Sequence, residues 1–395
     1  KVIIFGFIFT FFSSFGQSYF IGLFNSSIRT DLSITHGQFG TLYASATLLS
    51  SLILIWVGKK IDDMDVFKFS LFVTILLSFA CYFFSTIETV YFLFFGIFLL
   101  RLSGQGLMSH TATTTVSRYF EKTRGKALSI TWLGLSAAEF ILPVLIVFLL
   151  TFAIWRNIWI IISLVVLLVI PFFSFLLVKK LKLDSREVSK KNEVNNNNIK
   201  QWKRSEVIKD YRFYILAINM LGMPSIATGV FVYQSFIIYQ KNWGPFVFAQ
   251  SFMAYSILSV ITLSISGYLI DKFTSRKLLV YMNIPLLLAV FVLFSFNDPI
   301  SSFVLLGLIG ISNGFANVLG SSTWAEIYGV KYIGGIKAIT TAMMVFATAT
   351  GAATFGILID QGYNINFIAL ISGIYIAFSL LLLLIFRKKM EPVYL

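Results

Sequence analysis

The sequence predicts an all-α membrane protein with twelve transmembrane helices, arranged as two pseudo-symmetric six-helix bundles. Three observations predict this fold class. Of the 395 residues, 57% are hydrophobic and only 12% are charged, whereas soluble domains are about a quarter charged. The length accommodates about a dozen spans of about 20 apolar residues with short connections. One long polar segment divides six apolar spans from six others, and the two halves repeat short motifs.

Apolar runs bounded by short polar loops define the predicted helices. The first six occupy residues 2–28, 37–58, 67–86, 90–118, 125–152 and 155–178, and the last six occupy residues 211–240, 246–270, 277–296, 300–328, 333–359 and 363–386. Residues 1–178 are therefore expected to form an N-terminal bundle, and residues 211–395 a C-terminal bundle. Residues 179–210, rich in Lys and Asn, predict a cytoplasmic linker with a short surface helix around Gln201 to Lys209.

The basic residues predict the orientation in the membrane. The chain has a net charge of +14, and its Lys and Arg residues lie between spans on alternate connections. With the N-terminus in the cytoplasm, 27 of the 31 Lys and Arg residues fall on that side, only Arg29, Arg156 and Lys241 fall outside, and Arg101 lies within a span. The positive-inside rule then places both termini in the cytoplasm of a multi-pass protein of the plasma (inner) membrane. This distribution indicates the lipid bilayer as partner and argues against nucleic acid.

Short motifs recur at nearly constant offset. The stretch GKKIDD begins at Gly58 after the second span, and GYLIDK begins at Gly267 after the eighth, an offset of 209 residues. The same offset pairs Tyr119 with Tyr328. Each match is weak by itself, but all of them are in register with the six-plus-six arrangement of spans. Together they indicate that the two bundles arose by duplication.

These features resemble the major facilitator superfamily of secondary transporters over nearly the whole chain. The residues that carry the resemblance are the two G-x-x-x-D loops, the stretch RLSGQGLMSHTATTTVSRYFEKTR at 101–124, and the six-linker-six layout. The loop after span eight matches the family pattern, except that Thr274 replaces the usual Gly. The loop after span two departs further, with Asp63 where a base is usual. GQSYF at 16–20 and the R-x-x-G-x-G of span four resemble the branch of monocarboxylate porters and oxalate/formate exchangers.

Arg101 is the main candidate for a functional side chain. It lies about 15 Å below the outer end of span four, where a charge costs about 2.5–3.5 kcal/mol on insertion scales. On an α-helix, Gln105 would share its face, while Gly104 and Gly106 would allow close approach of a backbone or a ligand. His110 faces elsewhere on the helix, so a packed or hydrogen-bonded histidine is expected, with proton relay as the alternative.

Glu139 in span five is the predicted partner of Arg101. It lies near the middle of its helix, within about 6 Å of the depth of Arg101. One reading is a static ion pair that holds two helices in register. The other is functional: Arg101 binds an anionic substrate, or Glu139 takes up a proton, or both. The readings are compatible, because protonation of Glu139 would release Arg101 for a carboxylate.

The resemblance implies that spans one, four, seven and ten line a central cavity. Their polar residues are then candidates for substrate binding: Gln17, Tyr19, Asn25, Arg101, Gln105, Asn219, Tyr233, Gln234, Asn313 and Asn317. This set contains one positive charge among neutral amides and hydroxyls, which favours a small organic anion. The resemblance also implies a cytoplasmic latch that acts as a gate, formed by Asp62, Asp271, Lys272, Arg276, Arg118 and Arg124, to which we add Glu326. Glu139 is the candidate for proton coupling.

The sequence predicts a transporter rather than an enzyme. It contains no H-E-x-x-H, no nucleotide-binding loop and no Ser-His-Asp set. Two histidines and the single Cys81 form no spaced cluster, so we expect no metal site and no cofactor. A monocarboxylate is the expected cargo of a symporter working by alternating access, as a monomer by resemblance to the family. Anion exchange, facilitated movement of a polar neutral solute and a transport-inactive sensor remain alternatives.

Overall fold

The computed structural model describes residues 1–395 except 63, 121–123, 180–199, 330 and 394–395. It is all-helical over the described residues, as the sequence predicts. Eleven described helices are long and apolar enough to cross a membrane, and Val2–Gly16 is a shorter apolar helix. The chain divides into two compact units, Lys1–Asn192 with Phe231–Ser235, and Glu193–Val230 with Phe236–Leu395.

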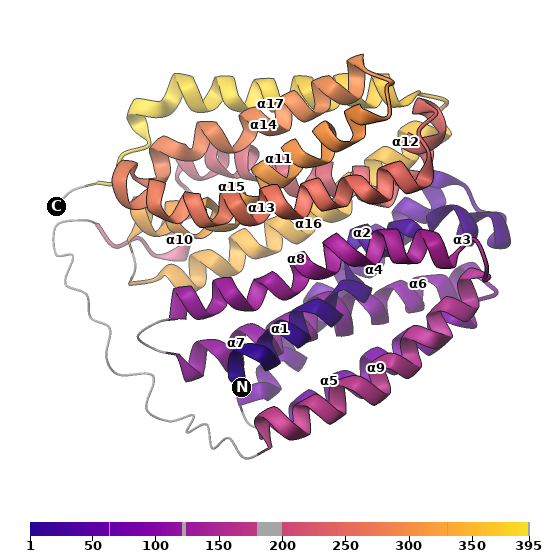
Figure 1. Cartoon of the computed structure of the whole chain (residues 1–395). Coiled ribbons are helices and arrows are strands. Elements are labelled where there is room, and N and C mark those ends of the chain that lie inside the picture. The colour runs from indigo at the N-terminus through magenta and orange to yellow at the C-terminus, as the bar shows by residue number, and fades with distance from the viewer. Residues whose placement is uncertain (63, 121–123, 180–199, 330, 394–395) are drawn as a thin grey trace. The chain divides into compact units, whose positions relative to one another are not determined.

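The first unit contains the first six spans (Figure 1). Its elements are α1 (Val2–Phe12), the 3-10 turn η1 (Ser13–Gly16), α2 (Ser18–Leu23), α3 (Asn25–Leu32), α4 (His36–Lys59), η2 (Lys60–Asp62), α5 (Val66–Ser85), α6 (Val90–Leu100), the π-helical η3 (Arg101–Met108), α7 (Ser109–Tyr119), α8 (Arg124–Leu149) and α9 (Trp155–Val178). Elements α6, η3 and α7 form one continuous span.

The first span is interrupted, and the prediction of one helix over 2–28 is therefore wrong. The α-helix ends at Phe12, and after the 3-10 turn Gln17 adopts an extended conformation, with φ −82° and ψ 153°. Ser13 Oγ donates a hydrogen bond to the Thr10 carbonyl at 2.7 Å. Serine side chains can compete in this way with the regular backbone hydrogen bonds of a helix. At the end of the turn, a Cβ on Gly16 would overlap with the Leu100 carbonyl oxygen, so this backbone approaches span four closely.

The second unit contains the remaining spans. Its elements are α10 (Arg204–Val207), α11 (Tyr211–Val232), α12 (Gln234–Lys241), α13 (Pro245–Phe273), α14 (Ser275–Ser295), α15 (Ile300–Tyr328), α16 (Ile333–Asp360), α17 (Ile365–Phe386) and the 3-10 turn η4 (Arg387–Lys389). The predicted span 211–240 is also interrupted, because α11 ends before Tyr233 and α12 begins after it. Only Arg204–Val207 of the expected surface helix is α-helical.

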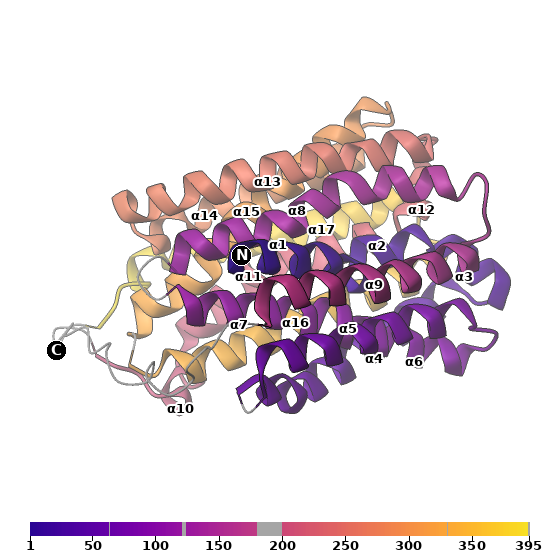
Figure 2. The same cartoon turned by 60° about the horizontal axis from the view of Figure 1, so that its bottom comes forward.

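The two units repeat the same internal packing. Helix α5 packs along α9 in the first unit, and α14 packs along α17 in the second, as both views show (Figure 1, Figure 2). Gly134 of α8 meets the Phe7 carbonyl of α1, and Gly351 of α16 meets the Ser225 carbonyl of α11, each so closely that a Cβ would overlap with the oxygen. The fifth and eleventh spans therefore use a glycine in the same way.

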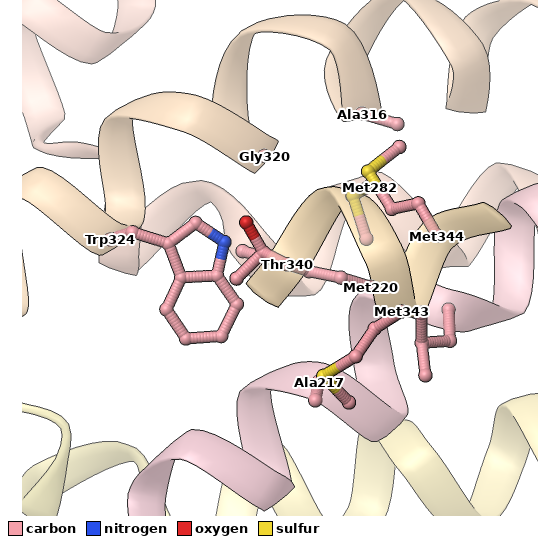
Figure 3. Close-up of a pocket in the computed structure, with 10 residues that line it drawn as sticks. Ala217, Met220, Met282, Ala316, Gly320, Trp324, Thr340, Met343 and Met344 are labelled. Atoms are coloured by element: carbon pink, nitrogen blue, oxygen red, sulfur yellow. The ribbon is translucent and has the colours of Figure 1, made fainter. Parts of the chain in front are cut away.

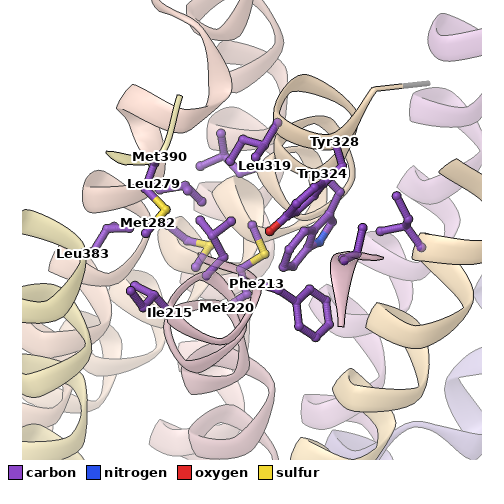
Figure 4. Packing of buried hydrophobic residues seen from close by; sticks show 14 of the residues in the cluster. Phe213, Ile215, Met220, Leu279, Met282, Leu319, Trp324, Tyr328, Leu383 and Met390 are labelled. Carbon is purple, nitrogen blue, oxygen red and sulfur yellow. The ribbon is translucent and has the colours of Figure 1, made fainter. Parts of the chain in front are cut away.

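A cluster of buried aliphatic side chains, with three methionines and three aromatic rings, forms a core within the second unit (Figure 4). Trp324 and Tyr328 of α15 stack with ring centroids 6.1 Å apart, and Phe213 of α11 packs against Trp324 at 5.3 Å. Met390, beyond the last span, is 2% exposed and joins this cluster. The segment after α17 is thereby anchored to its own unit.

Candidate functional site

Arg101 occupies a wide turn in the middle of the fourth span. The π-helical segment Arg101–Met108 begins at this residue, and such segments occur frequently at functional sites. Only 2% of the Arg101 surface is exposed. In a π-helix the backbone bond runs from residue i to i+5 rather than i+4. The prediction that Gln105 shares the face of Arg101 assumed α-helical spacing, and on this wider turn it stays a prediction.

The side chain of Arg101 contacts neutral groups of the first and second spans. Its Nη1 donates to the Gly16 carbonyl at 3.1 Å and lies 3.4 Å from Ser18 Oγ. Its guanidinium carbon lies 5.2 Å from the centre of the Tyr43 ring, within cation–π range. The Tyr43 hydroxyl donates to Ser18 Oγ at 2.8 Å. Arg101 Nε, although buried, has no hydrogen-bond partner among the described residues.

The interrupted first span reaches Arg101 because two glycines face each other. A Cβ on Gly104 would lie 2.6 Å from the Gly16 nitrogen, so both positions require the absence of a side chain. This is the close backbone approach that the sequence predicts for Gly104. Gln17, next to the contact, and Gln105, whose backbone nitrogen borders Gly16, are both half-buried.

The predicted pair between Arg101 and Glu139 does not form in this structure. Glu139 is 8% exposed on α8, and no ion pair joins it to Arg101 in the part of the chain that the structure describes. Tyr19 is within electrostatic reach of Glu139. The interrupted first span contacts Arg101 through Gly16 and Ser18, and it packs against α8, the helix that holds Glu139. Equal depth along two helices does not determine which faces meet, and this explains the wrong prediction.

Three further candidates bind backbone carbonyls within the first unit. Asn25 Nδ2 donates to the Val232 carbonyl at 2.8 Å, and Gln234 Nε2 donates to the Tyr19 carbonyl at 3.0 Å. The Tyr233 hydroxyl donates to the carbonyl of the first residue of α4 at 2.9 Å. The segment Phe231–Ser235 belongs to the first unit by its contacts. The interruption between α11 and α12 lies at these contacts: Val232 accepts the hydrogen bond from Asn25, and Tyr233 and Gln234 donate the other two.

The candidates of the second unit have different environments. Asn219 is fully buried, and both polar atoms of its amide lack a partner among the described residues. Its backbone carbonyl accepts a hydrogen bond from Asn283 Nδ2 at 2.7 Å. Asn313 Nδ2 donates to Ser259 Oγ at 2.9 Å, whereas Asn317, one turn further along α15, is exposed. Asn313 and Asn317 share one face of α15, but the Asn313 side chain binds α13 and the Asn317 side chain is exposed.

Glu326 and Arg276, two of the predicted latch residues, form an ion pair. Their Oε1 and Nε atoms lie 3.0 Å apart, and Glu326 Oε2 accepts from the backbone nitrogen of Ser275 at 2.9 Å. The carboxylate therefore also caps the first turn of α14, where the helix dipole favours a negative charge. Arg276 Nη1 lies 3.6 Å from a carboxylate oxygen of Glu391 in the C-terminal segment.

The other predicted latch residues have different environments. Arg118 Nη1 donates to the Ile61 carbonyl at 3.1 Å, which ties α7 to the loop after α4. Lys272 is exposed. The side chains of Asp62, Arg124 and Asp271 lie outside the described part of the structure.

The backbone conformation at Thr274 explains why the family pattern has a glycine at this position. Its backbone has φ 71° and ψ 148°, a conformation that is nearly restricted to glycine.

Sequence reasoning missed two residues at Arg101. Ser18 and Tyr43 were not candidates, although Ser18 belongs to the GQSYF stretch and Tyr43 lies in an otherwise apolar span. The signal for the interruption was the Ser-Ser-Phe-Gly sequence at 13–16, which has poor helix propensity.

His110 Nε2 lies 3.1 Å from the Gly58 carbonyl, consistent with a hydrogen-bonded histidine. No group of three or more His, Cys, Asp or Glu residues is placed to hold a metal among the described residues.

Comparison with known proteins agrees with the fold. The sequence model of the Major Facilitator Superfamily matches residues 6–284 and 230–394. No protein with a curated description matches the sequence significantly. A bacterial homologue of the human lysosomal transporter Spinster, inward-facing and unoccupied, superposes with a TM-score of 0.73 at 11% identity, over 98% of this chain and 97% of that one. The nucleoside transporter NupG gives a TM-score of 0.71 at 13% identity, over 99% of each chain. At such identities these likenesses establish the fold alone.

Proposed function

We propose that this chain, which belongs to the Major Facilitator Superfamily, is a secondary transporter that moves a small organic anion, a monocarboxylate, by alternating access. Membership of the family indicates a transporter rather than an enzyme. The observation that carries the choice of substrate is Arg101, a buried cation whose described hydrogen-bond acceptors are neutral. Its positive charge is left for a ligand to balance.

The geometry around Arg101 suits a carboxylate. A guanidinium has five N–H donors in a planar fork, and carboxylates accept two of them side by side. Nη1 is directed to Gly16 and Ser18, while the buried Nε lacks a partner among the described residues. Half-buried Gln17 and Gln105 lie next to the contact between Gly16 and Gly104, and in this proposal their amides supply neutral hydrogen-bonding groups. A small anion with one carboxylate and few polar substituents matches this set.

We assign proton coupling to Glu139. A buried carboxylate without a nearby cation carries a high desolvation cost, which protonation removes. Glu139 is 8% exposed and has no ion-pair partner among the described residues, and its helix α8 packs against the first span, which contacts Arg101. Uptake of one proton with one monocarboxylate would be electrically neutral. The proposal therefore includes symport rather than exchange.

The proposal also includes the setting of transport. We place the protein in the plasma membrane as a monomer with both termini in the cytoplasm, on the distribution of its Lys and Arg residues and its family membership. Glu326 and Arg276 then lie on the cytoplasmic side, where their ion pair acts as part of a gate.

Thermal stabilisation of the purified protein by a panel of small carboxylates, amino acids and neutral solutes tests the substrate class. A ligand that binds only the folded state raises its apparent stability, by about 2.7 kcal/mol at 100 times its Kd. We expect one class of carboxylates to stabilise the wild type and not Arg101→Ala, and Arg101→Lys to retain a weakened response. Stabilisation of a folded Arg101→Ala protein by the same carboxylates, or by neutral solutes alone, would contradict the proposal.

Uptake into proteoliposomes tests the coupling. Glu139→Gln is expected to retain exchange of the carboxylate across the membrane but to lose accumulation driven by a pH gradient. Glu88→Gln, the same chemical change at an exposed residue before the fourth span, is the matched control and should keep both activities. Accumulation by Glu139→Gln at the wild-type level would remove Glu139 from the coupling mechanism.

A further inference from the structure

The apolar cavity inside the second unit is too small for an organic ligand. It lies between α11, α14, α15 and α16, and its volume of about 20 Å³ holds about one water molecule. Trp324, Met282 and Met344 lie around this space (Figure 3). The surface of the same unit, in contrast, carries a group of cations where α17 ends and where α11 and α14 begin.

This basic patch consists of five exposed residues: Lys209, Lys277, Arg387, Lys388 and Lys389. The last three form η4, directly after α17, while Lys209 precedes α11 and Lys277 lies in the first turn of α14. None of the five has an ion-pair partner among the described residues. Their charges are therefore available to a partner from outside the chain.

Contacts between the three helix ends hold the basic patch together. The rings of Tyr211, at the start of α11, and Phe386, at the end of α17, lie 6.0 Å apart. Lys389 Nζ lies 5.6 Å from the centre of the Phe386 ring. Helix α14 packs along α17, and Arg276 Nη1 at the start of α14 lies 3.6 Å from a carboxylate oxygen of Glu391, just after η4. The cations thus share one corner of the second unit.

This corner lies at the depth of the lipid headgroups. Helix α17 has 22 residues, about 33 Å at 1.5 Å per residue, which is enough to cross the roughly 30 Å of hydrocarbon. Its exposed apolar side chains continue to Leu384 and Ile385, and the basic residues of η4 follow at once. Tyr211, Tyr214 and Tyr281 are also exposed near this end, and tyrosine is enriched where the bilayer meets water.

The carboxylates near the basic patch do not neutralise it. Asp210, next to Lys209, is buried and pairs with Arg212 at 2.7 Å. Glu391 is exposed, but its carboxylate lies beside Arg276. A group of four to eight Lys and Arg residues directly after a membrane helix is typical of sites for anionic lipids.

We propose that the basic patch binds the headgroup of an anionic phospholipid. The lysines and the arginine pair with the phosphate and with any second acidic group, while the acyl chains lie along the exposed apolar surface of α17 at Leu384 and Ile385. A lipid rather than a soluble phosphate is the partner, because the cations directly adjoin the surface that faces acyl chains. Arg101, at the proposed transport site, belongs to the other unit.

The loop after α4 in the first unit is a matched control. Lys59, Lys60 and Lys68 are also exposed, but three aspartates, at positions 62, 63 and 65, stand between them in the sequence. The charges of this loop balance, so it should not enrich anionic lipid. Phe72, one turn after Lys68 in α5, is exposed like Ile385, and the two positions can carry the same label.

Quenching of a local fluorophore by brominated lipids tests the proposal on the whole protein in nanodiscs. In a Cys81→Ala background, Ile385→Cys carries the label at the basic patch and Phe72→Cys carries it at the control loop. The nanodiscs contain phosphatidylcholine and phosphatidylglycerol, with bromine on the acyl chains of one lipid or the other. At equal mole fraction, we expect brominated phosphatidylglycerol to quench the label at position 385 about threefold more than brominated phosphatidylcholine, because the cations enrich it locally. At position 72 the two lipids should quench equally.

Charge-removing variants identify the residues that cause the preference. Arg387→Gln, Lys388→Gln and Lys389→Gln together should abolish it at position 385. Lys209→Gln with Lys277→Gln, which leaves η4 intact, should reduce it by about half, because attraction of anionic lipid scales with the number of cations. The same change at Lys59, Lys60 and Lys68 should leave it unaltered. Melting temperatures show whether each variant is folded.

Three results would overturn the proposal. The first is equal quenching at position 385 by the two brominated lipids in the protein with all five cations. The second is a preference that persists in folded variants of the basic patch, or that is as strong at position 72, since it would then belong to the whole membrane face. The third is loss of the preference on addition of millimolar glycerol phosphate, which would identify a soluble phosphate as the occupant.

Discussion

Arg101 is stabilised by neutral groups, and this distinguishes it from a structural ion pair. Insertion of an arginine at mid-helix depth costs about 2.5–3.5 kcal/mol, and a hydrogen bond to a charged group contributes about 1.5–3 kcal/mol. The bond to the Gly16 carbonyl and the weaker contact with Ser18, at 3.4 Å, are thus comparable with the cost of insertion. They leave the charge itself uncompensated.

Arg101→Lys tests whether the shape of the guanidinium is required. Lysine keeps the charge, but its compact ammonium lacks the fork that would bind Gly16 and a carboxylate at the same time. We expect kcat/KM for uptake of the carboxylate to fall at least tenfold, about 1.4 kcal/mol, with a small change in melting temperature. Transport at the wild-type rate would indicate that a positive charge alone is sufficient.

Thr274→Gly is expected to stabilise the protein. The positive φ at this residue costs about 1–3 kcal/mol for a side chain, and glycine loses about 0.5–1 kcal/mol more than alanine in conformational entropy. The net gain should be about 1 kcal/mol and should raise the melting temperature. Thr274→Ala keeps the backbone strain and serves as control. A lower melting temperature for Thr274→Gly than for wild type would contradict this assignment.

Asp31 should make stability depend on pH. Hydrogen bonds from the Trp155 indole, at 2.7 Å, and from Arg156 hold the pKa of Asp31 below its usual range. A carboxyl with a depressed folded-state pKa contributes stability above its unfolded pKa, about 3.9, and loses it as the pH falls through the folded value. Asp31→Asn should therefore lower the free energy of unfolding at pH 7, by at most about 1 kcal/mol because the pair is exposed. The difference in melting temperature from wild type should shrink towards pH 3; an equal difference at both pH values would rule out this linkage.

Local irregularities in the helices determine the candidate site. The turn Ser13–Gly16 brings a backbone carbonyl to Arg101, and a π-helical segment begins at Arg101 itself. Hydropathy placed the spans because the membrane requires about 20 apolar residues at each crossing. It could not reveal the interruption at Gly16, because phenylalanines surround it, nor the partner of Glu139, because helical faces depend on tertiary packing.

Gly351→Ala tests the close contact between α11 and α16. The added methyl group would overlap with the Ser225 carbonyl oxygen, which a backbone cannot easily move away from. We expect destabilisation of about 1–3 kcal/mol or more, the usual range for overpacking. Gly373→Ala, in a helix and with open space, should be neutral or stabilising. Equal melting temperatures for the two variants would contradict the close approach.

The chain divides into two compact units that repeat the same internal packing. Composition, charge and repeated motifs were sufficient to predict the all-helical membrane fold and the family, because they reflect requirements of the bilayer on every span. The identity of the cargo has no such signature. The proposed cargo rests on side chains such as Ser18, Tyr43 and Arg101, which are far apart in sequence and meet only after the spans have packed.

Labelling of single cysteines tests the orientation of the whole molecule. In a protein whose Cys81 has been replaced, a cysteine at Thr35, before α4, should react with a membrane-impermeant thiol reagent added to intact cells. A cysteine at Lys272, at the end of α13, should react only after the cells are opened. The opposite pattern would invert the predicted topology.

The contact between Gly16 and Arg101 has a consequence for biosynthesis. Backbone groups within a bilayer require partners, and the Gly16 carbonyl receives its donor from a residue 85 positions later in the chain. When the first span leaves the ribosome, the span that completes it has not yet been translated. The contact between Gly16 and Arg101 can therefore form only after the fourth span has been made and has packed against the first.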